Sequence, residues 1–136
     1  MSTDVKHLQC VVVTPEKTVL DESVDFVALP LYDGELGVLP GRAPVVGRLG
    51  YGELRTKSAV GVKRYFVDGG FAQTRDNVVT VLTNRAVPAE QVDAQAAATE
   101  LEQAQERHAS TDFELAEKDK AVARARARLR IASPKA

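Results

Sequence analysis

The sequence contains no tryptophan, one methionine and a single cysteine, Cys10. One cysteine excludes an internal disulfide framework and a cysteine-based metal centre. Because Cys10 precedes the apolar residues 11–13, we expect a buried and unreactive thiol in a reducing compartment. With only four phenylalanines and three tyrosines, the chain must build most of its core from valine and leucine.

Long apolar runs and an excess of charge of one sign are also missing. No stretch approaches the ~20 apolar residues of a membrane-spanning helix, and the polar residues 1–6 are unlike a secretory signal. The formal net charge is −1, which argues against general binding to nucleic acid. We therefore predict a protein that does not insert into a membrane, so that any membrane role would come through a partner.

Residues 5–87 alternate short apolar, β-branched runs with turn residues, which indicates strands. The runs are 7–13, 24–30, 45–49, 53–57, 60–68 and 78–83. The turn residues between them include Asp33-Gly34, Gly50-Tyr51-Gly52, Asp68-Gly69-Gly70 and Asp76-Asn77. Short strands punctuated in this way favour an antiparallel sandwich or barrel, so we assign residues 1–87 to an all-β N-terminal domain.

The composition changes at Pro88. Residues 89–131 contain no proline and no glycine, and alanine, glutamate, glutamine, lysine and arginine dominate, which favours helix. Residues 108–112 interrupt this pattern, and the side chain of Ser110, Thr111 or Asp112 can cap a second helix. Two helices of about five turns with so short a connection run antiparallel. The predicted fold is an all-β N-terminal sandwich (1–87) followed by a C-terminal antiparallel two-helix hairpin (88–136).

The predicted hairpin is acidic in its first half and basic in its second. Residues 88–117 hold eight acids and one base, whereas residues 118–136 hold seven bases and one acid. Antiparallel packing would place Glu90 and Asp93 level with the arginines at 126–130. Most apolar residues of the hairpin are alanines, which remove little area from water at ~25 cal/mol per Å². We therefore expect a weakly held hairpin that can move.

Residues 33–44 form the most distinctive segment, with glycine at 34, 37 and 41 and proline at 40 and 44. The residue types alone allow two interpretations. One is a rigid connection that presents Leu36, Val38 and Leu39 on its surface. The other is a pair of successive hairpin turns.

This segment resembles the signature loop of the epsilon subunits of F-type, rotary ATP synthases, which reads Gly-Glu-Leu-Gly, an apolar pair, and then Pro-Gly-His-Ala-Pro. Residues 50–55 are similar to the strand that follows the loop in that family, and residues 65–71 and 77–82 are similar to its final hairpin. Together with the alanine-rich helices, the resemblance covers nearly the whole chain. The order and spacing of these segments identify the chain as a member of the family.

The resemblance implies a sandwich of about ten strands, at the upper end of the usual range for a sheet. It also implies that the sandwich packs against the gamma subunit and rests on the membrane rotor ring of c subunits. The implied ring contact comprises Tyr32, Asp33, Gly34, Glu35 and Leu36, with Glu35 as the strongest candidate. Arg42 stands where most members carry histidine, at a position that contacts gamma.

The implied function is that of a central-stalk rotor subunit without catalytic activity. It would couple the gamma shaft to the rotor ring in proton-driven ATP synthesis and inhibit ATP hydrolysis through its C-terminal helices. As a peripheral membrane protein, it is expected on the cytoplasmic face of the bacterial inner membrane. The rival interpretations are a free-standing β-sandwich module that binds proteins through a charged helical hairpin, and an enzyme of unknown type.

Arginine occupies every second position from 124 to 130, so Arg124, Arg126, Arg128 and Arg130 spread over several faces of the second helix. Composition alone is compatible with a solvated helix end. Nucleic-acid binding is disfavoured, because no aromatic residue accompanies the arginines and the same hairpin is rich in acids. The resemblance instead implies an inhibitory helix that inserts beside gamma among the catalytic alpha and beta subunits, facing an acidic segment.

The resemblance also suggests a nucleotide site, because several bacterial members bind ATP through (Ile/Leu)-Asp-x-x-Arg-Ala in the first helix and arginines of the second. This chain reads Val92-Asp93-Ala94-Gln95-Ala96-Ala97, so Ala96 replaces the arginine. Asp93, Arg126 and Arg130 are therefore a weak nucleotide candidate, and we expect Asp93 to form an ion pair with Arg126 or Arg130 instead. No cofactor is predicted.

No catalytic set emerges from the sequence. His7 lies in a predicted strand and His108 in the predicted interhelical loop, and no serine or cysteine is arranged around either. The phosphate-binding pattern Gly-x-x-x-x-Gly-Lys does not occur. We therefore predict a non-catalytic protein that works through contacts with other proteins.

Overall fold

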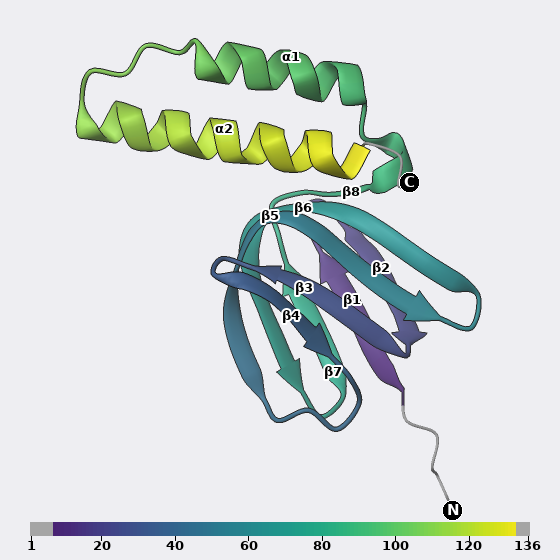
Figure 1. The fold of residues 1–136 in the computed structure, drawn as a ribbon. Helices are drawn as coiled ribbons and strands as arrows, with labels where there is room; N and C mark the ends of the chain where they lie inside the picture. The colour runs from purple at the N-terminus through teal and green to yellow at the C-terminus, as the bar shows by residue number, and fades with distance from the viewer. Residues whose placement is uncertain (1–6, 133–136) are drawn as a thin grey trace, which may run out of the picture.

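The computed structural model describes residues 7–132 and shows a β-sandwich with a two-helix hairpin at one end (Figure 1). The described strands are β1 (Leu8–Val13), β2 (Thr18–Val24), β3 (Phe26–Leu31), β4 (Gly34–Val38), β5 (Val45–Ser58), β6 (Gly61–Arg75), β7 (Val78–Leu82) and β8 (Ala86–Pro88). They form one sheet in the order β2-β1-β7-β6-β5-β3-β4, with β8 paired to β6. The β1–β7 pair is parallel and the other pairs are antiparallel. Because the sheet folds back on itself, side chains of β1, β2 and β7 share one core with those of β3 and β4.

β5 and β6 are the longest strands and run across both layers of the sandwich (Figure 1). They hold 14 and 15 residues and pair with each other along almost their full length. The turns predicted at Gly50-Tyr51-Gly52 and Asp68-Gly69-Gly70 are therefore wrong. Gly69 and Gly70 have φ values of 69° and 110°, so they bend β6 without ending it. Because β5 and β6 are not divided at these glycines, residues 7–132 contain eight strands rather than about ten.

The sequence patterns do not predict β2, β4 or β8. β4 pairs with β3 across a turn at Tyr32 and Asp33, so the hairpin interpretation of residues 33–44 is correct for the first turn. A second turn at Pro40 and Gly41 leads to β5, which is not a neighbour of β4 in the sheet. The turn predicted at Asp76-Asn77 is confirmed, and both residues have the positive φ that a tight two-residue hairpin turn requires.

The main core is built largely from valine and leucine, as the composition predicts. Its buried members come from each of the strands β1 to β7, and Leu8, Cys10 and Val12 have no exposed surface. Burial, together with the nearby carboxylates of Glu22 and Asp21, raises the pKa of the Cys10 thiol to about 12. The thiol is therefore uncharged and inaccessible near neutral pH, and the predicted burial of Cys10 is confirmed.

The hairpin consists of α1 (Ala94–Gln105) and α2 (Asp112–Ala132), preceded by the 3-10 turn η1 (Ala89–Gln91). α1 begins later than the composition predicts, because Val92 is extended and Asp93 caps the helix. The Asp93 carboxylate accepts hydrogen bonds from the backbone N–H groups of Gln95 (2.9 Å) and Ala96 (3.2 Å). The two helices of 12 and 21 residues make about three and six turns, not about five each.

α2 begins with a reciprocal cap that confirms Thr111 among the predicted capping residues. The Glu114 N–H donates to Thr111 Oγ1 at 3.0 Å. In return, the Glu114 carboxylate accepts from the N–H groups of Ser110 (2.9 Å) and Thr111 (3.3 Å). The hydrogen bonds that this carboxylate accepts from the N–H and hydroxyl groups of Ser110 and from Thr111 lower the pKa of Glu114.

α2 lies between α1 and the sandwich, over β5 and β6 (Figure 1). A second apolar cluster fills this contact and comprises Phe66, Ala89, Val92, Ala127 and Ile131. The side chain of Phe66 on β6 is completely buried there. The hairpin is poor in large apolar side chains, as predicted, and it places Val92 and Ile131 over Phe66, whereas Phe113 and Leu115 near the start of α2 are exposed.

The chain leaves the sandwich at β8, close to the predicted domain division at residue 87. Residues 1–6 and 133–136 of the two predicted domains lie outside the described range. Within that range, no helix combines the length and apolar content needed to cross a bilayer.

Candidate functional site

The predicted ring-contact residues lie at the turn between β3 and β4. Four of them are exposed, namely Tyr32, Asp33, Gly34 and Glu35. Leu36 is only partly exposed and packs against the main core. The guanidinium of Arg48 lies 4.4 Å from the centre of the Tyr32 ring, and Glu35 forms an ion pair with Arg55 at 3.2 Å. The structure thus brings four of the five predicted residues to one projecting tip, with Leu36 supporting it from inside.

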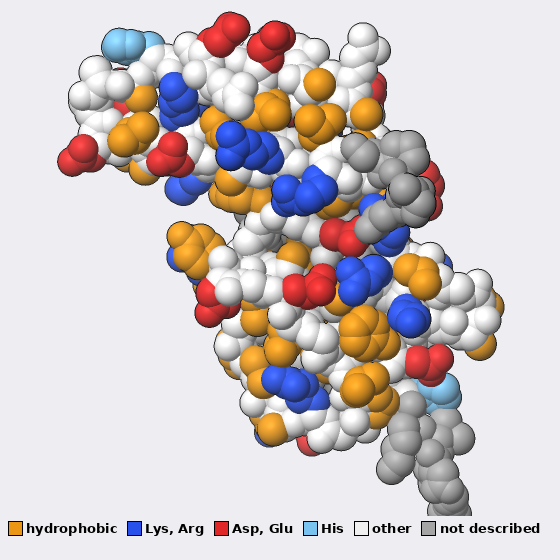
Figure 2. Space-filling model, viewed as in Figure 1, with side chains coloured by type: hydrophobic (Ala, Val, Ile, Leu, Met, Phe, Trp, Pro, Cys, Tyr) orange, Lys and Arg blue, Asp and Glu red, His pale blue; other side chains and the backbone are white. Residues whose placement is uncertain are grey.

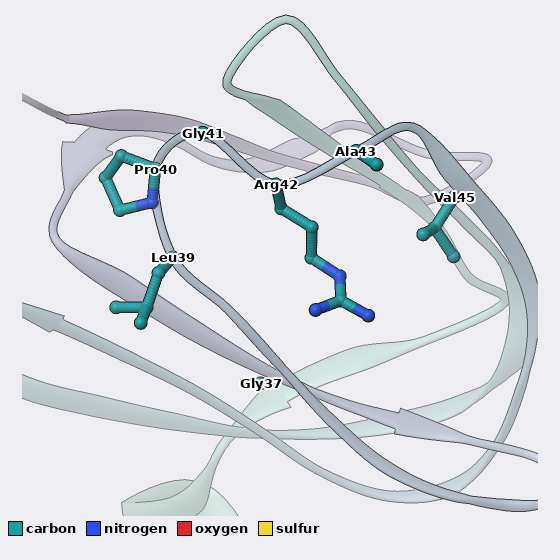
Figure 3. Close-up of a pocket in the computed structure, with 7 residues that line it drawn as sticks. All are labelled: Gly37, Leu39, Pro40, Gly41, Arg42, Ala43 and Val45. Carbon is teal, nitrogen blue, oxygen red and sulfur yellow. The ribbon is translucent and has the colours of Figure 1, made fainter.

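Arg42 lies in the loop 39–44, which leads into β5 (Figure 3). The loop borders a shallow hollow lined by Gly37, Leu39, Pro40, Gly41, Arg42, Ala43 and Val45. Gly41 has a φ of 86°, and its N–H donates to Asn77 Oδ1 at 2.8 Å, which ties the loop to the β6–β7 turn. Figure 3 shows the Arg42 side chain extending from the loop between Leu39 and Val45. Arg42 forms no ion pair within residues 7–132, so its charge is available to a partner.

An exposed apolar surface on β5, β6 and β7 was not predicted from the sequence. Val46, Phe71 and Leu82 are 74%, 59% and 53% exposed. The sheet register places Phe71 opposite Arg48 on β5 and opposite Leu82 on β7, so these side chains point to the same side. We call this surface the β5–β7 face, and its apolar members are Val46, Phe71, Val78 and Leu82. Exposed large apolar side chains gathered in this way make the face a candidate contact site.

An ion pair between Arg124 of α2 and Asp68 of β6 joins the hairpin to the sandwich. Arg124 Nε donates to Asp68 Oδ1 at 3.1 Å, and the guanidinium lies 4.9 Å from the centre of the Tyr51 ring. Asp68 is only 7% exposed. Burial of Arg124 disfavours its charge, but the hydrogen bond to Asp68 and the charge of Asp68 outweigh burial, so the pKa of Arg124 is raised.

The other arginines of α2 have different surroundings. Arg128 forms an ion pair with Glu100 of α1, and its guanidinium lies 5.9 Å from the centre of the Phe66 ring. Arg126 and Arg130 are exposed, and neither takes part in an ion pair with another residue of the described range. The four arginines therefore do not form one uniform basic surface.

The predicted ion pair of Asp93 with Arg126 or Arg130 is wrong. The Asp93 carboxylate caps α1, and the arginine that does reach an acid of the first helix is Arg128, which meets Glu100. Since α1 begins only at Ala94, the acids at 90 and 93 precede the helix rather than lying along it. The structure joins the three nucleotide candidates by no ion pair within the described residues.

The histidines and acids are dispersed over the surface: Figure 2 shows acidic side chains (red) on both the hairpin and the sandwich, and histidine side chains (pale blue) at opposite ends of this face. His7 Nδ1 lies 3.0 Å from a carboxylate oxygen of Asp25, and His108 is exposed in the interhelical loop. Within residues 7–132, no three His, Cys, Asp or Glu side chains gather closely enough to hold a metal ion. The most prominent features of residues 7–132 are therefore candidate contact surfaces, namely the tip between β3 and β4, the loop 39–44 and the β5–β7 face.

The sequence matches those of known proteins along most of its length. The family described as the β-sandwich domain of the ATP synthase delta/epsilon chain matches residues 7–89. An ATP synthase epsilon chain from Rhodopirellula baltica is 56% identical over 123 residues, which cover 90% of this chain and 96% of the relative. An ATP synthase epsilon chain from Nitratidesulfovibrio vulgaris is 40% identical over 128 residues, which cover 93% and 96%.

Solved structures share the fold. One chain in the cryo-EM structure of the Euglena gracilis mitochondrial ATP synthase (OSCP/F1/c-ring) matches with a TM-score of 0.82 and 26% identity, covering 92% of this chain and 81% of that one. One chain in the cryo-EM structure of the central stalk and c-ring of the Tetrahymena thermophila mitochondrial ATP synthase matches with a TM-score of 0.76. The second match covers 96% of this chain and all of that one at 14% identity, so it supports the fold alone.

Proposed function

The chain belongs to the epsilon family of F-type ATP synthases, and on this premise we propose that it is a non-catalytic rotor subunit that couples the gamma shaft to the membrane ring of c subunits. In this proposal the sandwich carries the permanent contacts and the hairpin inhibits ATP hydrolysis. The observation that carries the proposal is the β5–β7 face, because a sandwich that exposes large apolar side chains needs a partner to cover them. We expect a peripheral membrane protein on the cytoplasmic face of the bacterial inner membrane.

The proposed gamma contact comprises the β5–β7 face and the loop that holds Arg42. The hydrogen bond between Gly41 and Asn77 holds this loop beside the start of β7, so Leu39 and Arg42 lie at the edge of the face. The register sets Arg48, Gln73 and Thr80 among the apolar side chains of the face, and such a mixture of apolar and polar groups is usual in protein interfaces. Arg42 places a guanidinium group where most members carry histidine, and this group favours an acidic patch on gamma.

The proposed ring contact is the tip between β3 and β4. Its exposed residues combine the Tyr32 ring with the acidic groups of Asp33 and Glu35, which suits the polar loops of a rotor ring. Glu35 keeps more than half of its side chain exposed while it pairs with Arg55, so it can meet a ring subunit without a change of fold.

A chain that ends at Val87 tests this division between sandwich and hairpin. We expect the shortened chain to bind gamma and to support ATP synthesis, because every buried residue of the main core lies between Leu8 and Val81. Hydrolysis by the reconstituted enzyme should rise, since the inhibitory helices are gone. The measurements are gamma binding, ATP synthesis and ATP hydrolysis with the full and the shortened chain. Loss of gamma binding, with a circular dichroism spectrum that still shows a folded sandwich, would place the essential contact on the helices.

ATP is expected to bind the isolated chain only weakly. Ala96 stands where nucleotide-binding members carry arginine, and the Asp93 carboxylate is occupied by its cap hydrogen bonds. We expect a Kd in the millimolar range, about −4 kcal/mol or weaker, by titration calorimetry. Ala96→Arg should tighten binding, whereas Ala98→Arg, which adds the same charge at another exposed position of α1, should not. Micromolar binding by the unchanged chain would contradict this prediction.

A further inference from the structure

The four arginines of α2 divide into two pairs with different environments. Arg124 and Arg128 are both partly buried, whereas Arg126 and Arg130 are both exposed. Residues four apart lie on the same face of a helix, so each pair occupies one face. The first face meets the sandwich and α1. The second is exposed, and Arg130 at its end also borders a hollow with Glu53 and Arg64 of the sandwich.

The carboxylate of Asp68 depends on the folded hairpin for its charged partner, Arg124. The backbone of Asp68 is fixed by a hydrogen bond from its N–H to Thr83 Oγ1 at 3.1 Å and by one from Asn84 Nδ2 to its carbonyl at 3.2 Å. With Arg124 present, the nearly buried carboxylate has a charged partner, and that partner stacks on Tyr51. If Arg124 is removed while the hairpin stays in place, a buried carboxylate is left unpaired, which is strongly unfavourable. Release of the hairpin would return Asp68 to water and remove this penalty.

Arg128 joins the remaining parts of the same contact. Its ion pair with Glu100 connects α2 to α1, and its guanidinium approaches the ring of Phe66 on β6. Phe66 is the largest completely buried side chain in the contact between hairpin and sandwich. Arg128 therefore holds α1, α2 and β6 in one arrangement.

We propose that Arg124 and Arg128 form a latch that keeps the hairpin folded on the sandwich, whereas Arg126 and Arg130 act only on the partner that α2 meets after its release. The latch deepens the proposed inhibitory function and rests on it for its physiological meaning. It assigns opposite effects to two pairs of arginines in one helix. Loss of the latch pair favours release and so strengthens inhibition, and loss of the outer pair weakens inhibition.

Two double variants of the isolated full-length chain test the latch without the rest of the enzyme. Arg124→Ala/Arg128→Ala and Arg126→Ala/Arg130→Ala make the same change of composition and charge in the same helix. Short helices without tertiary packing are marginal in water, so amide hydrogen exchange of α1 and α2 reports release of the hairpin. We expect exchange to accelerate about tenfold or more in the latch variant and to change by no more than about twofold in the outer variant. Equal acceleration in both variants would overturn the latch.

A second variant set shows whether Asp68 is the partner. Arg124→Ala leaves the Asp68 carboxylate unpaired, so adding Asp68→Asn should slow exchange again by roughly threefold. Further acceleration would exclude Asp68 from the latch. Exchange in β1 and β7 serves as the folding control, because both strands lie in the main core. If they also accelerate in Arg124→Ala/Arg128→Ala, the Asp68→Asn result alone decides the question.

Hydrolysis by the reconstituted enzyme separates the latch from the proposed function. We expect lower ATP hydrolysis with the latch variant and higher hydrolysis with the outer variant. If exchange responds as expected but neither variant alters hydrolysis, the latch stands and the inhibitory function of the hairpin fails. If exchange does not distinguish the variants while the chain ending at Val87 still raises hydrolysis, the function stands and the latch fails.

Discussion

Replacing Gly70 with alanine should lower the melting temperature of this protein by about 15 °C or more. Gly70 has a φ of 110°, and a Cβ atom there would lie 1.9 Å from the carbonyl oxygen of Leu82 and 2.9 Å from the Cα of Thr83. Both are backbone atoms, so they cannot move aside without disturbing the β6–β7 pairing. Backbone strain and overlap together cost about 4 kcal/mol or more, against a total stability of ~5–15 kcal/mol. Thermal unfolding followed by circular dichroism measures the loss.

Gly61→Ala is the matched control for this substitution. Gly61 has a similar φ of 132°, but no heavy atom outside the adjoining residues lies within 4 Å of the position of its Cβ. Alanine there introduces the backbone strain without the overlap and should cost only ~1–2 kcal/mol. Equal melting temperatures for the two variants would show that β7 does not approach Gly70 as closely as the structure indicates.

The role of Gly70 also shows why local sequence patterns misplace the turns of the sandwich. Asp68-Gly69-Gly70 has the composition of a turn, and only its pairing with distant strands makes it a bend inside β6. The cap formed by Thr111 and Glu114 was predictable, because its hydrogen bonds join residues three apart. Features set by neighbours in the chain could be read from the sequence, whereas features set by long-range pairing could not.

The β5–β7 face could be predicted from the sequence only if the bounds of β6 were known. Phe71 alternates with Gln73 and Arg75, so an aromatic ring shares the polar side of β6. The expected turn at residues 68–70 hid this alternation, because it left residues 71–75 outside any predicted strand. An aromatic residue on the exposed side of a strand is a contact signal once the strand boundaries are correct.

Helical spacing predicts only part of the arrangement of the four arginines of α2. Spacing alone separates Arg124 and Arg128 from Arg126 and Arg130. It does not tell which pair meets the sandwich, because the acid that decides this is Asp68, in a strand of the other predicted domain. The four arginines, which the resemblance assigns together to an inhibitory helix, therefore lie in two different environments.

Replacing Phe71 with aspartate should abolish tight binding to gamma and leave the sandwich folded. Phe71 is 59% exposed in the isolated chain, so a polar side chain there should change stability by no more than about 0.5 kcal/mol. In the proposed complex, the same position lies among the apolar residues of the β5–β7 face, where a carboxylate would leave water without a partner. Large aromatic residues at the centre of an interface contribute ~2–4 kcal/mol, which corresponds to roughly 30- to 1,000-fold weaker binding. Titration of a gamma-containing catalytic core that lacks this subunit measures the change.

Val60→Asp is the control that separates the β5–β7 face from a general effect of added charge. Val60 is 86% exposed in the turn between β5 and β6, outside the β5–β7 face, and the substitution adds the same negative charge. It should bind as the unchanged chain does.

Arg42→Ala should weaken binding less than Phe71→Asp does. Its effect should fall mainly on the association rate and on the dependence of that rate on salt, because a charge at the rim steers encounter more than it holds the complex.

Equal binding by Phe71→Asp and Val60→Asp would remove the β5–β7 face from the gamma contact. Equal weakening of both would point to repulsion by the added charge. Only selective loss in Phe71→Asp, with an unchanged melting temperature, assigns the apolar face to gamma.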